Sequence, residues 1–191
     1  MYWLFVLYKN IKMKHGFFSK LSTNLYWQDL VLDNETLQQV NNIKALFLKY
    51  TQESKTNLKN KSQIVLFYGA ATKTKKDVAA LLGTALNKPV YMATLSALLS
   101  KYIGETEKNI SLVFDEAKRT GAILFFDEAD ALFGKRTVIK DAHDQYANLE
   151  VSYLMQKLED AHSIVIVSTK AKDYIDAAFT KRLNAVIAFL P

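Results

Sequence analysis

The chain alternates short apolar runs with segments in which apolar residues recur every three or four positions. A continuous apolar run predicts a strand covered on both faces, and the wider spacing predicts a helix with one buried face. The predicted strands are 63–68, 89–94, 122–126, 163–168 and 185–190. The predicted helices carry their apolar stripes within 37–47, 78–85, 110–117 and 151–158. This order predicts an α/β fold, a parallel sheet with helices on both faces.

The N-terminal segment, residues 1–30, shows neither pattern and is predicted to be an irregular, basic lead. Asp33 then supplies a candidate N-cap for the first helix, so the domain proper is predicted to span residues 31–191. The apolar start, residues 1–8, is far shorter than the roughly 20 residues of a membrane helix. It also lacks the features of a signal peptide, so we predict no membrane partner.

Composition narrows the class of protein further. A chain of 191 residues with 50% hydrophobic content fits one compact domain with a full core. The net charge of +6 comes largely from scattered lysines without a recognition motif, which favours a solvated surface and predicts no nucleic-acid partner. The absence of cysteine excludes disulfides and cysteine-type zinc sites, and agrees with a cytoplasmic location.

Two acidic residues close one of the apolar strands: Ile123–Phe126 is followed by Asp127 and Glu128. This is the pattern of a Walker B element, in which Asp127 would hold Mg²⁺ through water and Glu128 would orient the water that attacks ATP. The alternative is a strand end with solvated acids. The local pattern alone leaves both interpretations open, because acids often follow strands of parallel sheets.

A loop that starts with glycine lies between the first apolar strand and the next helix, where a Walker A phosphate loop would stand. Its residues are Gly69, Ala70, Ala71, Thr72, Lys73, Thr74, Lys75 and Lys76. The motif requires Gly-x-x-x-x-Gly-Lys-Ser/Thr. Gly69 and Lys75 match, but Thr74 replaces the second glycine and Lys76 replaces the hydroxyl that binds magnesium. We therefore predict a distorted phosphate cradle with a cation beside the magnesium position.

From about residue 26 onward the chain resembles AAA+ ATPases of the AAA type. The resemblance is strongest at the run Leu99–Ile110, which is similar to the first pore loop of the family, and at Phe126–Arg136, which is similar to its Walker B region. Residues 141–148 resemble a bacterial subgroup, some members of which accompany contractile injection systems. The acidic strand end at Asp127 and Glu128 and the sequence around it then agree, which favours the Walker B interpretation.

The resemblance implies a P-loop NTPase fold with a five-stranded parallel sheet, the cofactors ATP and Mg²⁺, and a ring, usually a hexamer, acting on a protein substrate. It places the substrate pore loop at Lys101, Tyr102, Ile103 and Gly104, with Tyr102 gripping the substrate. The alternative for Tyr102 is a partly buried aromatic residue. It also makes Arg182 a candidate arginine finger that acts on a neighbour's ATP.

Further departures from the family concentrate at the nucleotide. The polar sensor position falls on Lys170, and one residue of the interface arginine pair is Lys181. The chain stops at Pro191, where the helical lid domain of the family would begin. Three functions therefore stay open: an ATP-hydrolysing remodeller, a nucleotide-inactive subunit or assembly scaffold, and a truncated, decaying copy.

Overall fold

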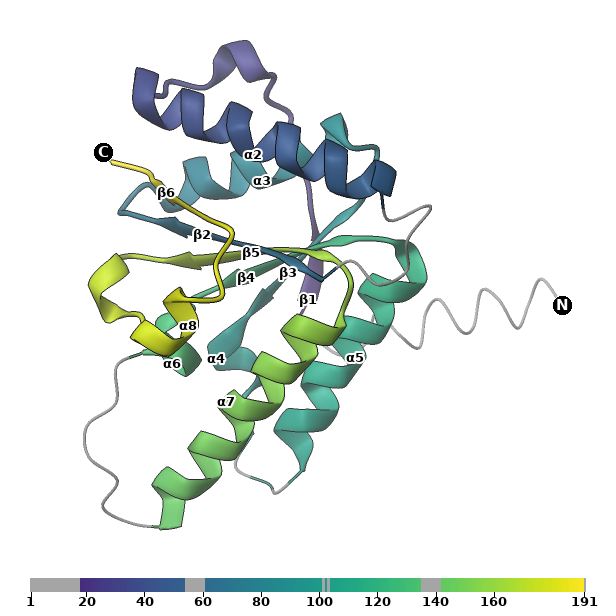
Figure 1. Cartoon of the computed structure of the whole chain (residues 1–191), viewed down its shortest axis with the longest axis vertical. Coiled ribbons are helices and arrows are strands. Elements are labelled where there is room, and N and C mark those ends of the chain that lie inside the picture. Colours follow the sequence, from purple (N-terminus) through teal and green to yellow (C-terminus); the bar gives the residue numbers. More distant parts are fainter. Residues whose placement is uncertain (1–17, 54–60, 101, 103, 135–141, 191) are drawn as a thin grey trace, which may run out of the picture.

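The computed structural model describes residues 18–53, 61–100, 102, 104–134 and 142–190, without the side chains of Leu132 and residues 142–148. One sheet lies between two helical layers (Figure 1). The strands are β1 (Phe18–Leu21), β2 (Gln63–Tyr68), β3 (Val90–Thr94), β4 (Ile123–Asp127), β5 (Ile164–Thr169) and β6 (Ala185–Ala188). The long helices are α2 (Asn34–Glu53), α3 (Thr72–Ala85), α5 (Glu105–Thr120) and α7 (Ala142–Asp160). Short helical turns are η1 (Trp27–Asp29), α4 (Leu95–Leu98), α6 (Asp130–Phe133), η2 (Lys172–Tyr174) and α8 (Ala177–Thr180).

The sheet confirms the predicted α/β class. Its strand order is β1-β3-β4-β5-β2-β6, and the five strands from β3 to β6 pair in parallel, as expected from the alternation of strands and helices. Because β2 pairs with β5 on one side and β6 on the other, it lies inside the sheet with its end beside the end of β5. This order brings the carboxyl ends of β4, β5 and β2 next to one another.

A sixth strand, β1, departs from the prediction, because it lies inside the segment expected to be irregular. It pairs antiparallel with β3, with Phe18 opposite Ala93 and Leu21 opposite Val90. Phe18 also makes an edge-on ring contact with Tyr91. The strand has four residues, of which only the two ends are partly buried, so it carries too little alternation to be recognised from sequence. Residues 1–17 of the same segment lie outside the described residues.

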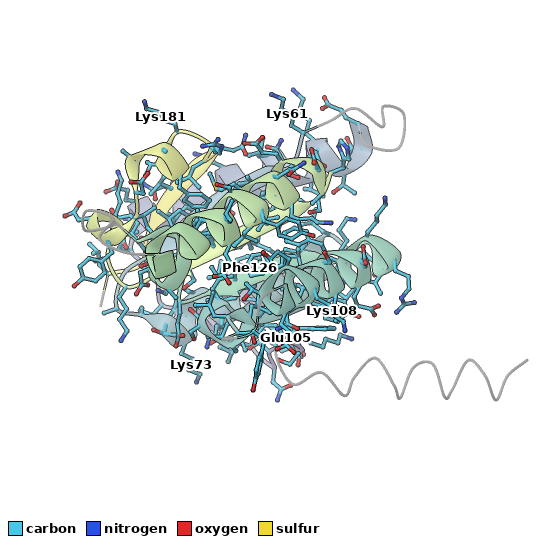
Figure 2. All side chains as sticks on the ribbon, turned by 90° about the horizontal axis from the view of Figure 1, so that it is seen from below. Lys61, Lys73, Glu105, Lys108, Phe126 and Lys181 are labelled. Atoms are coloured by element: carbon cyan, nitrogen blue, oxygen red, sulfur yellow. The ribbon has the colours of Figure 1, made fainter. Side chains whose placement is uncertain are left out.

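Two apolar layers hold the helices on the sheet. Figure 1 shows α2 and α3 on one side of the sheet and α5 and α7 on the other. Alternate residues of the strands belong to the apolar layer of one side or of the other. In β4, for example, Phe125 packs with the first layer and Phe126 with the second. The strands are thus buried on both faces, which is why they read as continuous apolar runs. Figure 2 shows Phe126 between the helices of the second layer.

The predicted N-cap is confirmed at the start of α2. Asp33 Oδ1 accepts a hydrogen bond from the Thr36 backbone N–H at 2.9 Å, which satisfies one of the free donors of the first turn. Thr36 Oγ1 donates to the Ala188 carbonyl at 2.9 Å, so the same turn is fixed to the end of β6. Among the described residues, no helix combines the length and apolarity needed to cross a membrane.

Candidate nucleotide site

The predicted phosphate loop and the predicted acidic pair meet at the carboxyl edge of the parallel sheet. Gly69 follows β2, Asp127 ends β4, and Thr169 ends β5, which lies between those two strands. Open α/β sheets bind their ligands outside this edge. The structure therefore brings together the phosphate loop and the acidic strand end, although about sixty residues separate them in the chain.

The phosphate loop is shorter than predicted. Helix α3 begins at Thr72, so only three residues, Gly69 to Ala71, remain between β2 and the helix. The Lys75 backbone N–H donates to the Ala71 carbonyl at 3.1 Å, and the Thr72 N–H donates to Ala70 at 2.7 Å. These amides are therefore engaged within the loop and the helix instead of facing a phosphate. The predicted loop extended to Lys76, but residues from Thr72 onward belong to α3.

Threonine at position 74 is compatible with this early helix start. A glycine at this position would permit the left-handed backbone and would weaken the helix, whereas threonine resists positive φ and continues the helical turn. Gly69 keeps its glycine character with a φ of 121°. A Cβ on Gly69 would lie 2.0 Å from the Phe189 carbonyl oxygen, so the start of the loop touches the backbone that follows β6.

The side chain of Lys75 points into the protein. It is 1% exposed, and its Nζ donates to the Gly69 carbonyl at 2.8 Å and to the Thr169 carbonyl at 2.7 Å. Burial lowers the pKa of Lys75, with Lys76 and Lys170 acting in the same direction, while Asp127 and Asp130 oppose the shift. Lys73, two positions earlier, is exposed and projects away from the ribbon (Figure 2). The lysine that matches the motif is thus a structural bridge between the loop and β5.

This burial predicts a pH dependence of stability. With its pKa below the ordinary value of 10.5, Lys75 loses its proton in the folded state first, so the unfolded chain binds more protons between the two pKa values. The free energy of unfolding should therefore rise with pH in that window, and the rise should be absent from Lys75→Met. Urea unfolding from neutral pH to about 10.4 checks this, with Lys73→Met as the exposed control. Equal pH slopes for wild type and Lys75→Met would contradict it.

Lys76 pairs with the predicted magnesium-binding residue. Its Nζ lies 2.8 Å from Asp127 Oδ2, and the other carboxylate oxygen of Asp127 accepts the Glu128 backbone N–H at 3.1 Å. A P-loop site holds Mg²⁺ with a Ser or Thr hydroxyl and with the acidic residue of the β-strand. Here the ammonium group of Lys76 stands in place of the hydroxyl and forms an ion pair with the carboxylate of Asp127. Among the described residues, no three acidic, histidine or cysteine side chains gather as metal ligands. Because the hydroxyl ligand is missing and the carboxylate of Asp127 is paired with Lys76, this pair of positions does not fit a magnesium ion.

Glu128 stands apart from this pair. Its φ is 56°, in the left-handed region that few residues other than glycine adopt, and its side chain is exposed. Glu128 Oε2 accepts a hydrogen bond of 2.5 Å from Ser96 Oγ, which lies on α4 just after β3. Such backbone strain is often found at functional sites. The carboxylate predicted to orient water thus faces a neighbouring hydroxyl at the same sheet edge.

One polar residue of the site, Thr169, was missed by sequence reasoning. Thr169 Oγ1, at the end of β5, donates to Asp130 Oδ1 at 3.0 Å, while the Thr169 carbonyl accepts from Lys75. Lys170, predicted at the sensor position, has an exposed side chain, and its carbonyl accepts the Gly69 N–H at 3.1 Å. A hydroxyl that follows a run of buried apolar residues was the available signal for Thr169.

The candidate arginine finger lies away from this edge. Arg182 Nε donates to Glu159 Oε1 at 2.5 Å, and one terminal nitrogen donates to the Ala178 carbonyl at 2.9 Å. Glu159 belongs to the last turn of α7, and Arg182 follows α8. Both side chains are about half exposed, and ion pairs of this kind stabilise by about 0–1 kcal/mol. The structure does not bring Arg182 to the nucleotide site of its own chain.

Tyr102 lies on an exposed loop between α4 and α5. It is 73% exposed, which excludes the alternative of a partly buried aromatic residue. The base of the loop is fixed: Thr106 Oγ1 accepts the Ser100 N–H at 3.0 Å, and Ser100 Oγ accepts the Tyr102 N–H at 3.2 Å. Gly104 turns the chain into α5 with a φ of 79°. Lys101 and Ile103, also predicted for the pore loop, lie outside the described residues.

Proteins of known family resemble this chain in sequence and in fold. Residues 65–190 match the model of the ATPase family associated with various cellular activities (AAA). The chain is 28% identical over 163 residues to an uncharacterized AAA family ATPase of Sinorhizobium fredii, a match that covers 84% of this chain and 48% of that protein. It is 29% identical over 164 residues to a cell division cycle protein 48 homolog of Archaeoglobus fulgidus, which covers 83% and 22% respectively.

A third relative is a proteasome-associated ATPase of Streptomyces coelicolor, 32% identical over 121 residues that cover 58% of this chain and 20% of the relative. Among solved structures, the AAA domain of FIGL-1 superposes with a TM-score of 0.69 over 97% of this chain and 60% of its own, at 18% identity. That likeness concerns the fold. The chain spans half or less of these curated relatives. By the family match over residues 65–190, the chain belongs to the AAA ATPase family.

Proposed function

We propose that this member of the family engages a protein substrate through the loop that carries Tyr102, while its own nucleotide site does not hydrolyse ATP. The observation that carries the proposal is the state of the phosphate loop. Its helix begins at Thr72, and its motif lysine, Lys75, is buried against two backbone carbonyls. The relatives are consistent with a protein substrate, since one is by name associated with the proteasome.

The energetic argument concerns the developing charge on the phosphate. Hydrolysis requires backbone amides, a lysine and a metal ion that are already oriented toward that charge. Removing one such donor from an enzyme costs about a hundredfold to a thousandfold in rate. Here the Gly69, Thr72 and Lys75 amides are bonded internally, the Lys75 side chain is engaged with carbonyls, and Lys76 pairs with Asp127. These combined changes support a site without turnover.

Assembly and location are part of the same proposal. A ring, a hexamer by resemblance to the family and formed from this chain alone or with a related subunit, would line up copies of the Tyr102 loop around one channel. The exposed Tyr102 and the exposed Arg182 support such a role, because both side chains can reach a neighbouring molecule. We place the protein in the cytoplasm. The bacterial subgroup suggested by residues 141–148 stays a prediction, because the side chains of that segment lie outside the described ones.

The test compares Tyr102→Ala with Glu128→Gln in a binding experiment. We expect fluorescein-labelled casein, an unstructured protein probe, to bind wild type and Glu128→Gln equally, and Tyr102→Ala about tenfold more weakly, as for the loss of one aromatic anchor. The melting temperature should not change in Tyr102→Ala, since the side chain is mostly exposed. Fluorescence anisotropy measures the binding. Unchanged binding by Tyr102→Ala would overturn the assigned role of the loop.

One observation favours a second candidate, an ATP-hydrolysing remodeller. Asp127 and Glu128 stand together at the end of β4, and Glu128 holds a strained backbone of the kind found at functional sites. In that case Glu128→Gln would abolish a magnesium-dependent release of phosphate that wild type shows. Under the first proposal, both proteins release phosphate at the same background rate. A steady-state phosphate assay on the two proteins separates the candidates.

A further inference from the structure

We propose that Lys76 is a resident cation that replaces magnesium in this site, so that the chain takes a nucleoside polyphosphate in its metal-free form. The inference rests on the proposed function only in assigning this sheet edge to a nucleotide phosphate. The exclusion of the metal stands on the contacts of Lys76 and Asp127 alone. It goes beyond a loss of activity, because it assigns a charge-balancing role to the residue that breaks the motif.

The carboxylate of Asp127, the predicted magnesium ligand, already has partners within the chain. Lys76 Nζ lies 2.8 Å from Asp127 Oδ2, while Asp127 Oδ1 accepts the Glu128 N–H, so both carboxylate oxygens already have partners. The side chain of Asp127 is 13% exposed and that of Lys76 is 31% exposed. The charges therefore meet largely out of water, where their attraction is stronger than at the surface. Removing the ammonium group alone leaves a buried carboxylate that needs another cation.

The ion pair between Lys76 and Asp127 opposes a second cation at this position. Lys75, the preceding residue of the same helix, is held by the Gly69 and Thr169 carbonyls, so Lys76 is the lysine that pairs with Asp127. A divalent ion that bound Asp127 would have to displace the ammonium group of Lys76. The hydroxyl that P-loop proteins offer to magnesium is also missing, because Lys76 itself stands at that position. The site therefore lacks the hydroxyl ligand, and the charge of its carboxylate ligand, Asp127, is already neutralised by Lys76.

The ligand chemistry follows from this charge arrangement. Nucleotides in the cell are mostly bound to magnesium, because the metal offsets their phosphate charge. A P-loop site binds that complex. In this chain the charge of Lys76 is taken up by Asp127, so the lysine of the first turns of α3 that is left to face a phosphate is the exposed Lys73. Free ADP or ATP, without magnesium, is thus the form that complements the site, and magnesium does not assist binding, because Asp127 is already paired with Lys76.

The experiment measures metal binding first, with Mn²⁺ alone as the probe. We expect no Mn²⁺ site at Asp127 in the wild-type chain by electron paramagnetic resonance, and a gain of at least about tenfold in Mn²⁺ affinity in Lys76→Thr. The double variant Lys76→Thr with Asp127→Asn should lose that gain. Mn²⁺ should raise the melting temperature of Lys76→Thr and leave that of wild type unchanged, which also monitors the folding of each variant.

Lys73→Thr is the matched control, because it removes one lysine from the same helix at an exposed position. If Lys73→Thr gains as much Mn²⁺ affinity as Lys76→Thr, the effect is general charge and the proposal is overturned. It is equally overturned if wild type binds Mn²⁺ as tightly as Lys76→Thr does. Should Lys76→Thr fail to fold, Lys76→Met keeps the aliphatic stem and removes the charge, and the same two outcomes apply.

Nucleotide binding is measured second. A fluorescent ADP analogue should bind wild type at least as tightly in EDTA as in magnesium, and magnesium should favour binding only in Lys76→Thr. Tighter wild-type binding in magnesium than in EDTA would overturn the metal-free ligand. If wild type binds no nucleotide in either buffer, the nucleotide assignment fails, while the Mn²⁺ result decides on its own whether Lys76 fills the metal position.

Discussion

Replacing Thr74 by glycine and Lys76 by threonine together should give the chain magnesium-dependent ATP binding at least about a hundredfold tighter than that of wild type. Glycine at 74 permits the positive φ that threonine resists, so the first turn of α3 can open and turn its amides toward the phosphates. Threonine at 76 frees Asp127 and supplies the hydroxyl for magnesium. Each regained hydrogen bond to a charged group contributes about 1.5–3 kcal/mol, and two of them account for the expected gain.

The measurement is a titration with a fluorescent ATP analogue in magnesium, repeated in EDTA. Each single variant serves as a control, because Thr74→Gly alone leaves the ion pair intact and Lys76→Thr alone leaves the helix starting at Thr72. The double variant should therefore exceed both. Lys75→Ala in the same background should remove the gained binding. An affinity of the double variant no better than that of wild type would show that the loop is not what limits binding.

The largest effect on stability is expected at Gly69. Alanine there would place its Cβ 2.0 Å from the Phe189 carbonyl oxygen, and its backbone would have to keep a φ of 121° that L-residues rarely adopt. Overlap with packed atoms costs about 1–3 kcal/mol, and backbone strain of this kind costs about 1–3 kcal/mol more. Against a total stability of about 5–15 kcal/mol, Gly69→Ala should lower the melting temperature by about ten degrees or prevent folding.

Gly104→Ala separates the two contributions to this loss. Gly104 also has a positive φ, 79°, but a Cβ there would meet no atom within 4 Å. Gly104→Ala should therefore cost only the backbone strain, about 1–3 kcal/mol, and should lower the melting temperature by less than Gly69→Ala does. Differential scanning calorimetry of the two variants gives the comparison. Equal losses in both variants would remove the close approach of Phe189 as a cause.

The fold was predictable from sequence because its strands are buried on both faces. In β4, each residue from Ile123 to Phe126 contacts one of the two apolar layers, so the strand appears as an unbroken apolar run. The same reasoning found the stripe of α5 and the cap at Asp33. It missed β1, whose four residues offer one partly buried residue at each end and two exposed ones between them.

The site was predictable in its location and less so in its contacts. Parallel strands bring Gly69, Asp127 and their neighbours to one edge, and a motif comparison identifies Thr74 and Lys76 as unusual. The length of the loop was not predictable from the motif, because it depends on how far α3 extends toward Gly69. Nor was the Glu159 partner of Arg182, since that contact joins α7 to the turn after α8 and no local pattern links them.

The position of β2 within the sheet also orders the events of folding. β3 and β4 pair residues that lie close in the chain, such as Val90 and Ile123, whereas β2 pairs its Gln63 with Ile164 and its Val65 with Ala185. Closing the longer loops costs more chain entropy and delays those contacts. Because synthesis proceeds from the N-terminus, β2 acquires its neighbours β5 and β6 only after the residues up to Ala188 have been made. We therefore expect the phosphate loop, which follows β2, to reach its final form later than the paired β3 and β4.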